Sequence, residues 1–250
     1  MSAILARICR RSLRYLPALA ILACIGGTGC ESTDATAMLD AIGSGNAGEL
    51  TVGEISTGLK EALKVGTETA STTASTEDGY LKNPRLHIPP PPQVRKVTDT
   101  LRKVGMGAMV DDFETSMNRG AEQAAREAMP VFRDAILAMT IDDARAILSG
   151  PDDAATQYFR RTTSDTLTAR YRPIVRDNLD RVGAAREYNL LLDRYKALGL
   201  GAPENADLDA YVTDQALNGL FLLVADQEAK IRKDPAARTS AILRRVFGGN

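Results

Sequence analysis

The sequence contains little of the chemistry on which most enzyme sites depend. Its 250 residues include no tryptophan, one histidine, His87, and three cysteines, all within the first thirty residues. With one histidine in a proline-rich stretch, we expect no histidine-based zinc site and no Ser-His-Asp or Cys-His catalytic arrangement. The sequence also lacks a Walker loop, a dinucleotide-binding glycine pattern and a Gly-x-Ser-x-Gly motif. No catalytic residue, metal or cofactor is therefore predicted.

The apolar run near the N-terminus is too short to cross a membrane. Leu16–Ile25 is ten residues long, whereas a spanning helix needs about 20 apolar residues. Arginines without any acidic residue precede this run, and three glycines and a threonine follow it, directly before Cys30. A basic start, a short apolar centre and small residues are typical of a secretory signal peptide. Residues 1–29 are therefore predicted to be a signal peptide.

The position of Cys30 resembles the end of a bacterial lipoprotein signal, in which the cysteine becomes the lipid-modified first residue. Cys24 fits better by the residues before it, but cleavage there would leave a short, proline-interrupted apolar region, so Cys30 is preferred. Ordinary cleavage near Gly29 is the alternative. Lipidation would remove a lone thiol from an oxidising compartment. We expect a lipid anchor on the periplasmic side of a bacterial envelope membrane, or secretion to the periplasm without lipidation.

Basic residues are in the minority after the predicted signal. The whole chain has 31 basic and 32 acidic residues, and the signal removes four basic ones, which leaves 27 against 32 and a net charge near −5. Nucleic-acid binding needs a basic face, so we expect no nucleic-acid partner. The expected partners are the membrane, through the lipid, and an unknown protein or small ligand.

Beyond residue 50 the sequence predicts helices. No stretch alternates convincingly with the period of a strand, whereas apolar residues recur at helical spacing. We predict an all-α fold, an irregular multi-helix bundle in a single domain over residues 51–250. Residues 30–50, rich in small and polar residues, are predicted to be a flexible tether. The first helical stripe consists of Ile55, Leu59, Ala62, Leu63, Gly66, Ala70 and Ala74, and its small residues favour close helix packing.

Prolines predict where the helices are interrupted. The four prolines Pro89–Pro92 forbid continuous helix and indicate an extended connector. Pro130 is predicted to begin a new segment or to kink a helix, and Pro173 to kink another. Ser164 is predicted to cap a separate helix.

Other boundaries are predicted from capping residues and apolar content. Thr140 with Asp143 resembles a capping arrangement for a helix from Ile141. The segment Thr213–Arg232 is apolar over most of its girth, which predicts a place in the middle of the bundle. A final docking helix is predicted from Ala241, Ile242, Val246 and Phe247.

Polar residues beside the predicted apolar stripes provide the candidate site. Buried polar groups need hydrogen-bond partners, so one interpretation is that these residues pair with one another between helices. The functional interpretation is a polar pocket at a helix junction, where Arg160 or Arg161 binds an anionic group. The candidate residues are Glu114, Asn118, Arg119, Tyr158, Arg160, Arg161 and Glu228.

Acidic pairs suggest an alternative chemistry. They are Asp111-Asp112, Asp142-Asp143 and Asp152-Asp153. Paired carboxylates can hold Mg²⁺ or Ca²⁺, which keeps a carboxylate-based or metal-assisted periplasmic enzyme open as the alternative function. Each pair lies at or near a predicted helix start, where negative charge is stabilised by the helix dipole. Capping is therefore the preferred interpretation.

Several long motifs resemble one protein family. They are GYLKNPRLHIPPP, VGMGAMVDDFETSMNRGA, MTIDDARAILSGPDDAATQYFRRTTS, ALNGLFLLVADQEAKIRKDP and the SAILRRVFG ending. Together they resemble the bacterial domain-of-unknown-function family 4197, from about Ile55 to Gly248. The resemblance implies an exported, mostly helical protein, frequently with a lipoprotein signal. It implies no known activity and no catalytic residues. We expect a non-enzymatic binding or scaffold module.

Overall fold

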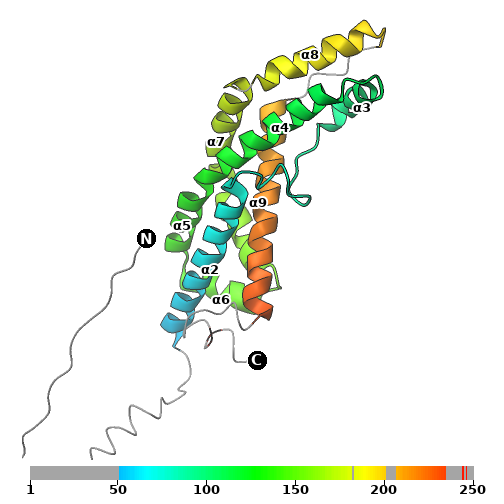
Figure 1. Ribbon diagram of the computed structural model, residues 1–250. Coiled ribbons are helices and arrows are strands. Elements are labelled where there is room, and N and C mark those ends of the chain that lie inside the picture. Colours follow the sequence, from blue (N-terminus) through cyan, green and yellow to red (C-terminus); the bar gives the residue numbers. More distant parts are fainter. Residues whose placement is uncertain (1–50, 182, 201–206, 235–243, 245, 247–250) are drawn as a thin grey trace, which may run out of the picture. The chain divides into compact units, whose positions relative to one another are not determined.

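The computed structural model describes residues 51–181, 183–200, 207–234, 244 and 246, and the regular elements in these ranges are all helices (Figure 1). The predicted all-α fold in a single domain is thereby confirmed. The predicted signal peptide, the tether and most of the predicted C-terminal helix lie outside the described residues. The elements are α2 (Val52–Ser75), η1 (Pro92–Val94), α3 (Arg95–Lys103), α4 (Gly107–Ala124), η2 (Ala125–Glu127), α5 (Ala128–Ala138), α6 (Ile141–Ser149), α7 (Ala154–Arg181), α8 (Ala184–Ala197) and α9 (Leu208–Lys233), where η denotes a 3-10 helix.

Helix α2 begins at a capping box. The Thr51 hydroxyl accepts from the Glu54 amide at 3.2 Å, and the Glu54 carboxylate accepts from the Thr51 amide at 2.9 Å. These bonds satisfy two of the amides that a helix start leaves without partners. The predicted small-residue stripe is buried from Leu59 to Ala74, and a Cβ placed on Gly66 would lie 3.3 Å from the Cβ of Gln227 on α9. The absence of a side chain at Gly66 therefore permits the close approach of α2 and α9.

Helix α9 contacts α2, α4 and α7, as its apolar sequence predicts (Figure 1). Phe221 of α9 joins Phe132 and Phe159 in an aromatic cluster, with Phe132 at ring-centroid distances of 5.1 Å from Phe159 and 6.2 Å from Phe221. Both contacts are edge-to-face, the arrangement in which ring quadrupoles attract. Among the described helices, none combines the length and apolar character that crossing a bilayer requires.

Helices α7 and α9 run antiparallel. The start of α7 is bonded to Glu228 near the end of α9, and Arg172 further along α7 is paired with Asp209 in the first turn of α9. This register places Arg160 of α7 beside the middle of α9, where it reaches Asn218 and Phe221.

The predicted break at Ser164 is wrong. Helix α7 continues from Ala154 to Arg181, through Ser164 and through Pro173. The hydroxyls beside the expected break do not cap a new helix. Thr162 and Thr163 instead donate to the carbonyls of Tyr158 and Phe159 at 2.8 and 2.6 Å, four residues earlier in the same helix. The continuing helix thus provides acceptors for both hydroxyl groups.

The boundaries predicted at Pro130 and Thr140 are confirmed. Pro130 lies in the first turn of α5, where its missing amide hydrogen costs no helical bond. Thr140 caps α6, since its hydroxyl accepts from the Asp143 amide at 3.1 Å and its own amide donates to the Asp143 carboxylate at 3.0 Å. Asp143 of the acidic pair Asp142-Asp143 therefore serves as a cap.

The connector, residues 76–91 between α2 and η1, packs across α9 at a glycine. A Cβ on Gly219 would lie 2.9 Å from the Cε1 atom of Tyr80 and 3.3 Å from a methyl carbon of Leu86. Both side chains are buried. The connector therefore needs the bare backbone of α9 at this position.

Replacing Gly219 with alanine should lower the free energy of unfolding by about 2 kcal/mol, because an added methyl group in a packed site forces its neighbours to move. Urea unfolding of the chain, followed by far-ultraviolet circular dichroism, measures the change. Gly53→Ala is the matched control, since that glycine also lies in a helix but has nothing within 4 Å of its Cβ position. Equal effects of the two substitutions would show that the connector does not depend on Gly219.

Candidate functional site

Asn118 of α4 fixes the end of the connector. Its Oδ1 accepts from the Ile88 amide at 2.8 Å, and its Nδ2 donates to the Ile88 carbonyl at 3.0 Å and to the Glu114 carbonyl at 2.8 Å. The side chain is fully buried. A backbone segment without regular structure has no internal partners for its polar groups. Asn118 provides partners for both the amide and the carbonyl of Ile88, as a neighbouring strand would in a β-sheet.

Glu122, one turn further along α4, fixes the start of the connector. Its Oε1 accepts from the amides of Tyr80 and Leu81, both at 3.1 Å, and its Oε2 accepts from Arg119 at 2.6 Å. Arg119 also donates to Asp78 at 2.7 Å. Hydrogen bonds lower the pKa of Asp78, with the larger effect from Lys82 and the smaller from Arg119. The buried Glu122 carboxylate is thus paired and hydrogen-bonded, as burial of a charge requires.

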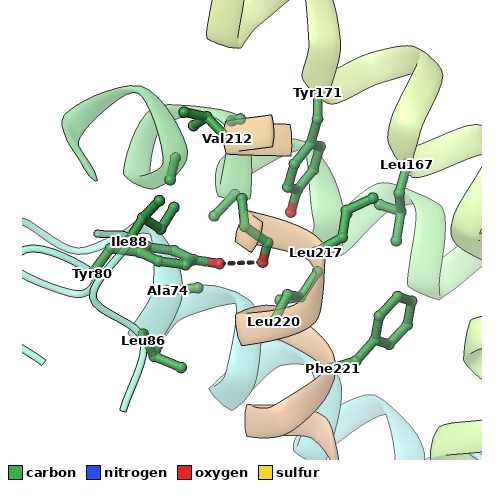
Figure 2. Close-up of a cluster of buried hydrophobic side chains, with 14 of the residues drawn as sticks. Ala74, Tyr80, Leu86, Ile88, Leu167, Tyr171, Val212, Leu217, Leu220 and Phe221 are labelled. Atoms are coloured by element: carbon green, nitrogen blue, oxygen red, sulfur yellow. Dashed lines mark hydrogen bonds between the residues drawn. The ribbon is translucent and has the colours of Figure 1, made fainter. Parts of the chain in front are cut away.

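Tyr80 attaches the connector to α9. Figure 2 shows the Tyr80 hydroxyl directed at the backbone of α9, where it donates to the Ala216 carbonyl at 2.7 Å. Burial is the main cause that raises the pKa of Tyr80, and the charge of Glu122 adds to it. The hydroxyl therefore remains a donor. Arg85 adds a two-pronged ion pair with Asp226 of α9, at 2.6 and 3.0 Å. The connector is consequently held in a fixed position along one side of α9.

A groove lies between the connector, the first turns of α7 and the middle of α9. Its volume is about 390 Å³, within the range of small-molecule sites in proteins. The connector provides Arg85, Leu86 and His87, and α9 provides a stripe that includes Gln215, Asn218 and Leu222. On α7 the wall includes Thr156 and Arg160. The lining of the groove therefore combines apolar side chains with several polar groups.

Arg160 is the cation of this groove that has no acidic partner. Its guanidinium lies over the ring of Phe221, with 4.6 Å between Cζ and the ring centroid, and it donates to Asn218 Oδ1 at 3.4 Å. In the described part of the chain, no carboxylate oxygen lies within 4.0 Å of the Arg160 guanidinium, the distance limit for an ion pair. The aromatic ring and the amide orient the guanidinium without neutralising it. This arrangement can bind an anionic group.

The other candidate residues on α7 and α9 have structural partners. Glu228 accepts from the amides of Ala155 and Thr156, each at 2.9 Å, and from Arg232 at 2.9 Å. It therefore caps the start of α7 from another helix. The Tyr158 hydroxyl donates to the Ala135 carbonyl at 3.0 Å.

The remaining candidates also lie apart from the groove. The Arg161 guanidinium lies 5.7 Å from the Tyr158 ring centroid. Glu114 of α4 pairs with Arg102 at 2.9 Å, and its carboxylate lies 3.6 Å from His87 Nε2. The structure thus distributes the candidates over several contacts, and of the full set only Arg160 lines the groove.

The sequence interpretation did not assign His87, Gln215 or Asn218 to a site, and it considered Asp153 only within the acidic pair Asp152-Asp153. These residues come together only because the connector crosses α9 while α7 runs antiparallel beside it. The one local signal was the polar face of the otherwise apolar segment 213–232, where Gln215 and Asn218 are three residues apart.

One member of each acidic pair has an ordinary ion-pair partner. Asp111 pairs with Arg102 at 2.6 Å and Asp152 with Lys233 at 3.2 Å. Within the described ranges, no group of three or more His, Cys, Asp or Glu residues is arranged to hold a metal ion.

Fold and groove define an all-helical, single-domain protein with a groove on its surface. The chain belongs to the family described as protein of unknown function (DUF4197), whose model matches residues 49–248. The resemblance found in the sequence motifs is thereby confirmed. No curated protein and no solved structure matches the chain.

Proposed function

We propose that the protein is a lipid-anchored binding module of the bacterial cell envelope. Residues 1–29 are its signal peptide, Cys30 carries the lipid, and residues 30–50 tether the domain on the periplasmic side of a membrane. The order of arginines, short apolar run, small residues and cysteine supports this anchor. Attachment through more than one acyl chain is lasting. The domain then binds a protein or a small ligand close to the membrane surface.

The position of Arg160 is the observation that supports binding of a ligand. An exposed arginine usually pairs with a nearby carboxylate or extends into water, whereas Arg160 is oriented over Phe221 at the wall of a groove of about 390 Å³. Three buried side chains fix the opposite wall, since Asn118, Glu122 and Tyr80 hold the connector in place. Preorganised walls reduce the entropic cost of binding. The groove therefore suits a ligand with an anionic group.

Replacing Cys30 with alanine should abolish acyl labelling and release the protein from membranes. The reason is that Cys30 is the residue predicted to carry the lipid, and the described helices contain no membrane-spanning segment. Metabolic labelling with a fatty-acid analogue, followed by membrane fractionation, measures both effects. Cys24→Ala is the matched control and should label as the wild type does. Labelling that persists in Cys30→Ala and disappears in Cys24→Ala would move the anchor to Cys24.

Replacing Arg160 with glutamine should remove a ligand that copurifies with the wild-type chain. Native mass spectrometry of the gently purified protein is expected to show an added mass on the wild type and none on the variant. Arg161→Gln removes the same charge from the next residue, whose guanidinium faces Tyr158, and should keep the added mass. An added mass that survives in Arg160→Gln, or a wild type that carries none, would contradict binding through this groove.

A further inference from the structure

We infer that the groove binds short peptides with free termini, an inference that rests on the proposed binding function. It starts from two charges on the α7 side. Asp153 directly precedes α7, Arg160 lies two turns further on, and both line the groove. Within the described ranges neither has an ion-pair partner within 4.0 Å. Asp153 accepts a hydrogen bond from the neutral Gln157 amide at 2.8 Å, which leaves its charge uncompensated.

The spacing of these two charges selects the length of the ligand. Positions seven residues apart share one face of a helix and are separated by about 10 Å along its axis. The two charged groups of a free amino acid are too close together to reach both residues. An extended chain advances about 3.3 Å per residue, so the ammonium and carboxylate of a tripeptide span the required distance.

Asp153 and Arg160 give the two ends of the groove opposite charges. Arg85 of the connector also lines the groove, and it is paired with Asp226 of α9. Arg85 is therefore neutralised, whereas Asp153 keeps its charge. At the other end Arg160 faces Asn218 and Phe221. His87 completes the charged and titratable lining, and its Nε2 lies 3.6 Å from Glu114. A zwitterion fits with its ammonium at Asp153 and its carboxylate at Arg160.

The other lining residues suit a peptide. Gly219 lines the groove through its backbone, because Tyr80 and Leu86 of the connector occupy the space where a side chain would lie. Gln215 and Asn218 provide side-chain amides, which donate to and accept from peptide groups. Leu222 is 36% exposed, and with Ala225 it offers apolar contact to a side chain of the peptide. Because of these features, we expect the groove to bind a peptide rather than a small dianion.

Isothermal titration calorimetry of the full chain in mild detergent, with trialanine as the probe, tests the inference. Trialanine with free termini should bind. N-acetyl trialanine and trialanine amide should each bind at least about tenfold more weakly, because each loses one charge-assisted contact. Dialanine should also bind more weakly, because its termini do not span the groove.

Variants assign each terminus to its residue. In Arg160→Gln, the free and amidated peptides should bind equally weakly, because the partner of the carboxylate is gone. In Asp153→Asn, acetylation of the peptide should make no further difference. Arg161→Gln and Asp152→Asn are the matched controls and should leave all affinities unchanged, since neither residue lines the groove.

The outcomes separate this inference from the proposed function. Insensitivity of the affinity to both terminal modifications would overturn the peptide inference, as would equal effects of Arg160→Gln and Arg161→Gln on trialanine binding. If trialanine does not bind while Arg160→Gln still removes the copurifying mass, the peptide inference fails and the binding module stands. If neither trialanine binding nor a copurifying mass depends on Arg160, both fail.

Discussion

Glu228→Ala should lower the free energy of unfolding by about 4 kcal/mol, because removing one partner of a buried charged network is strongly destabilising. The Glu228 carboxylate is 5% exposed and accepts from Ala155, Thr156 and Arg232. Its removal deprives the first turn of α7 of a cap that α9 supplies. Urea unfolding monitored by circular dichroism measures the loss.

Two further variants make this prediction specific. Glu228→Gln keeps an acceptor oxygen of similar position but no charge, so it should cost about 2 kcal/mol. Asp152→Ala removes an acidic residue that lies near the same helix start but is 74% exposed and paired only with Lys233 among the described contacts, so it should cost at most about 0.5 kcal/mol. A similar loss in Asp152→Ala and Glu228→Ala would show that general charge near α7, rather than the buried cap, is responsible.

Asn118→Ala should cost about 3 kcal/mol, because it leaves the buried amide and carbonyl of Ile88 without their partners and each such group costs about 1–3 kcal/mol. The same variant should also free the connector, so hydrogen exchange of the Ile88 amide should accelerate at least about a hundredfold relative to the wild type. Hydrogen exchange read by mass spectrometry, at a pH where both chains remain folded, measures this acceleration.

Asn178→Ala is the matched control for Asn118→Ala. Asn178 is also buried, but its Nδ2 donates to the Ile174 carbonyl of its own helix at 2.8 Å. Its removal should leave exchange at Ile88 unchanged. Protection of Ile88 that survives in Asn118→Ala would contradict the role assigned to this side chain.

Local patterns in the sequence account for much of the fold. The buried stripe of α2 follows from apolar and small residues at helical spacing, and the Thr140 cap follows from the position of Asp143. Pro89–Pro91 lie in the extended end of the connector, and Pro92 opens η1. Each of these features depends on residues within a few positions of one another, so one sequence is sufficient to predict them.

The break predicted at Ser164 failed because two local tendencies compete there. Serine and threonine can cap a helix, but the hydroxyls of Thr162 and Thr163 also bond to carbonyls four residues earlier in a continuing helix. The long α7 buries Phe159, Leu167 and Tyr171 along one side. Packing against α9 and α4 therefore favours continuation, and that packing is not visible in the local sequence.

The site was less predictable than the fold because its contacts join distant residues. Glu228 accepts from an amide of α7 that lies 73 positions earlier in the chain, and Asn118 bonds a connector residue 30 positions away. The sequence identified both as polar residues in need of partners, and the i, i+4 spacing predicts the pair of Glu228 with Arg232, but the distant backbone partners were not predicted. Arg160 was a candidate, whereas the groove around it depends on the route of the connector across Gly219.

A crystal structure of the chain, purified gently from its own cells, tests binding in the groove most directly. We predict density for a bound molecule between the connector and α9, with an acidic group at the guanidinium of Arg160 and the ring of Phe221 beneath that guanidinium. A groove that contains only water, in crystals whose protein carries a ligand elsewhere on the domain, would contradict this assignment.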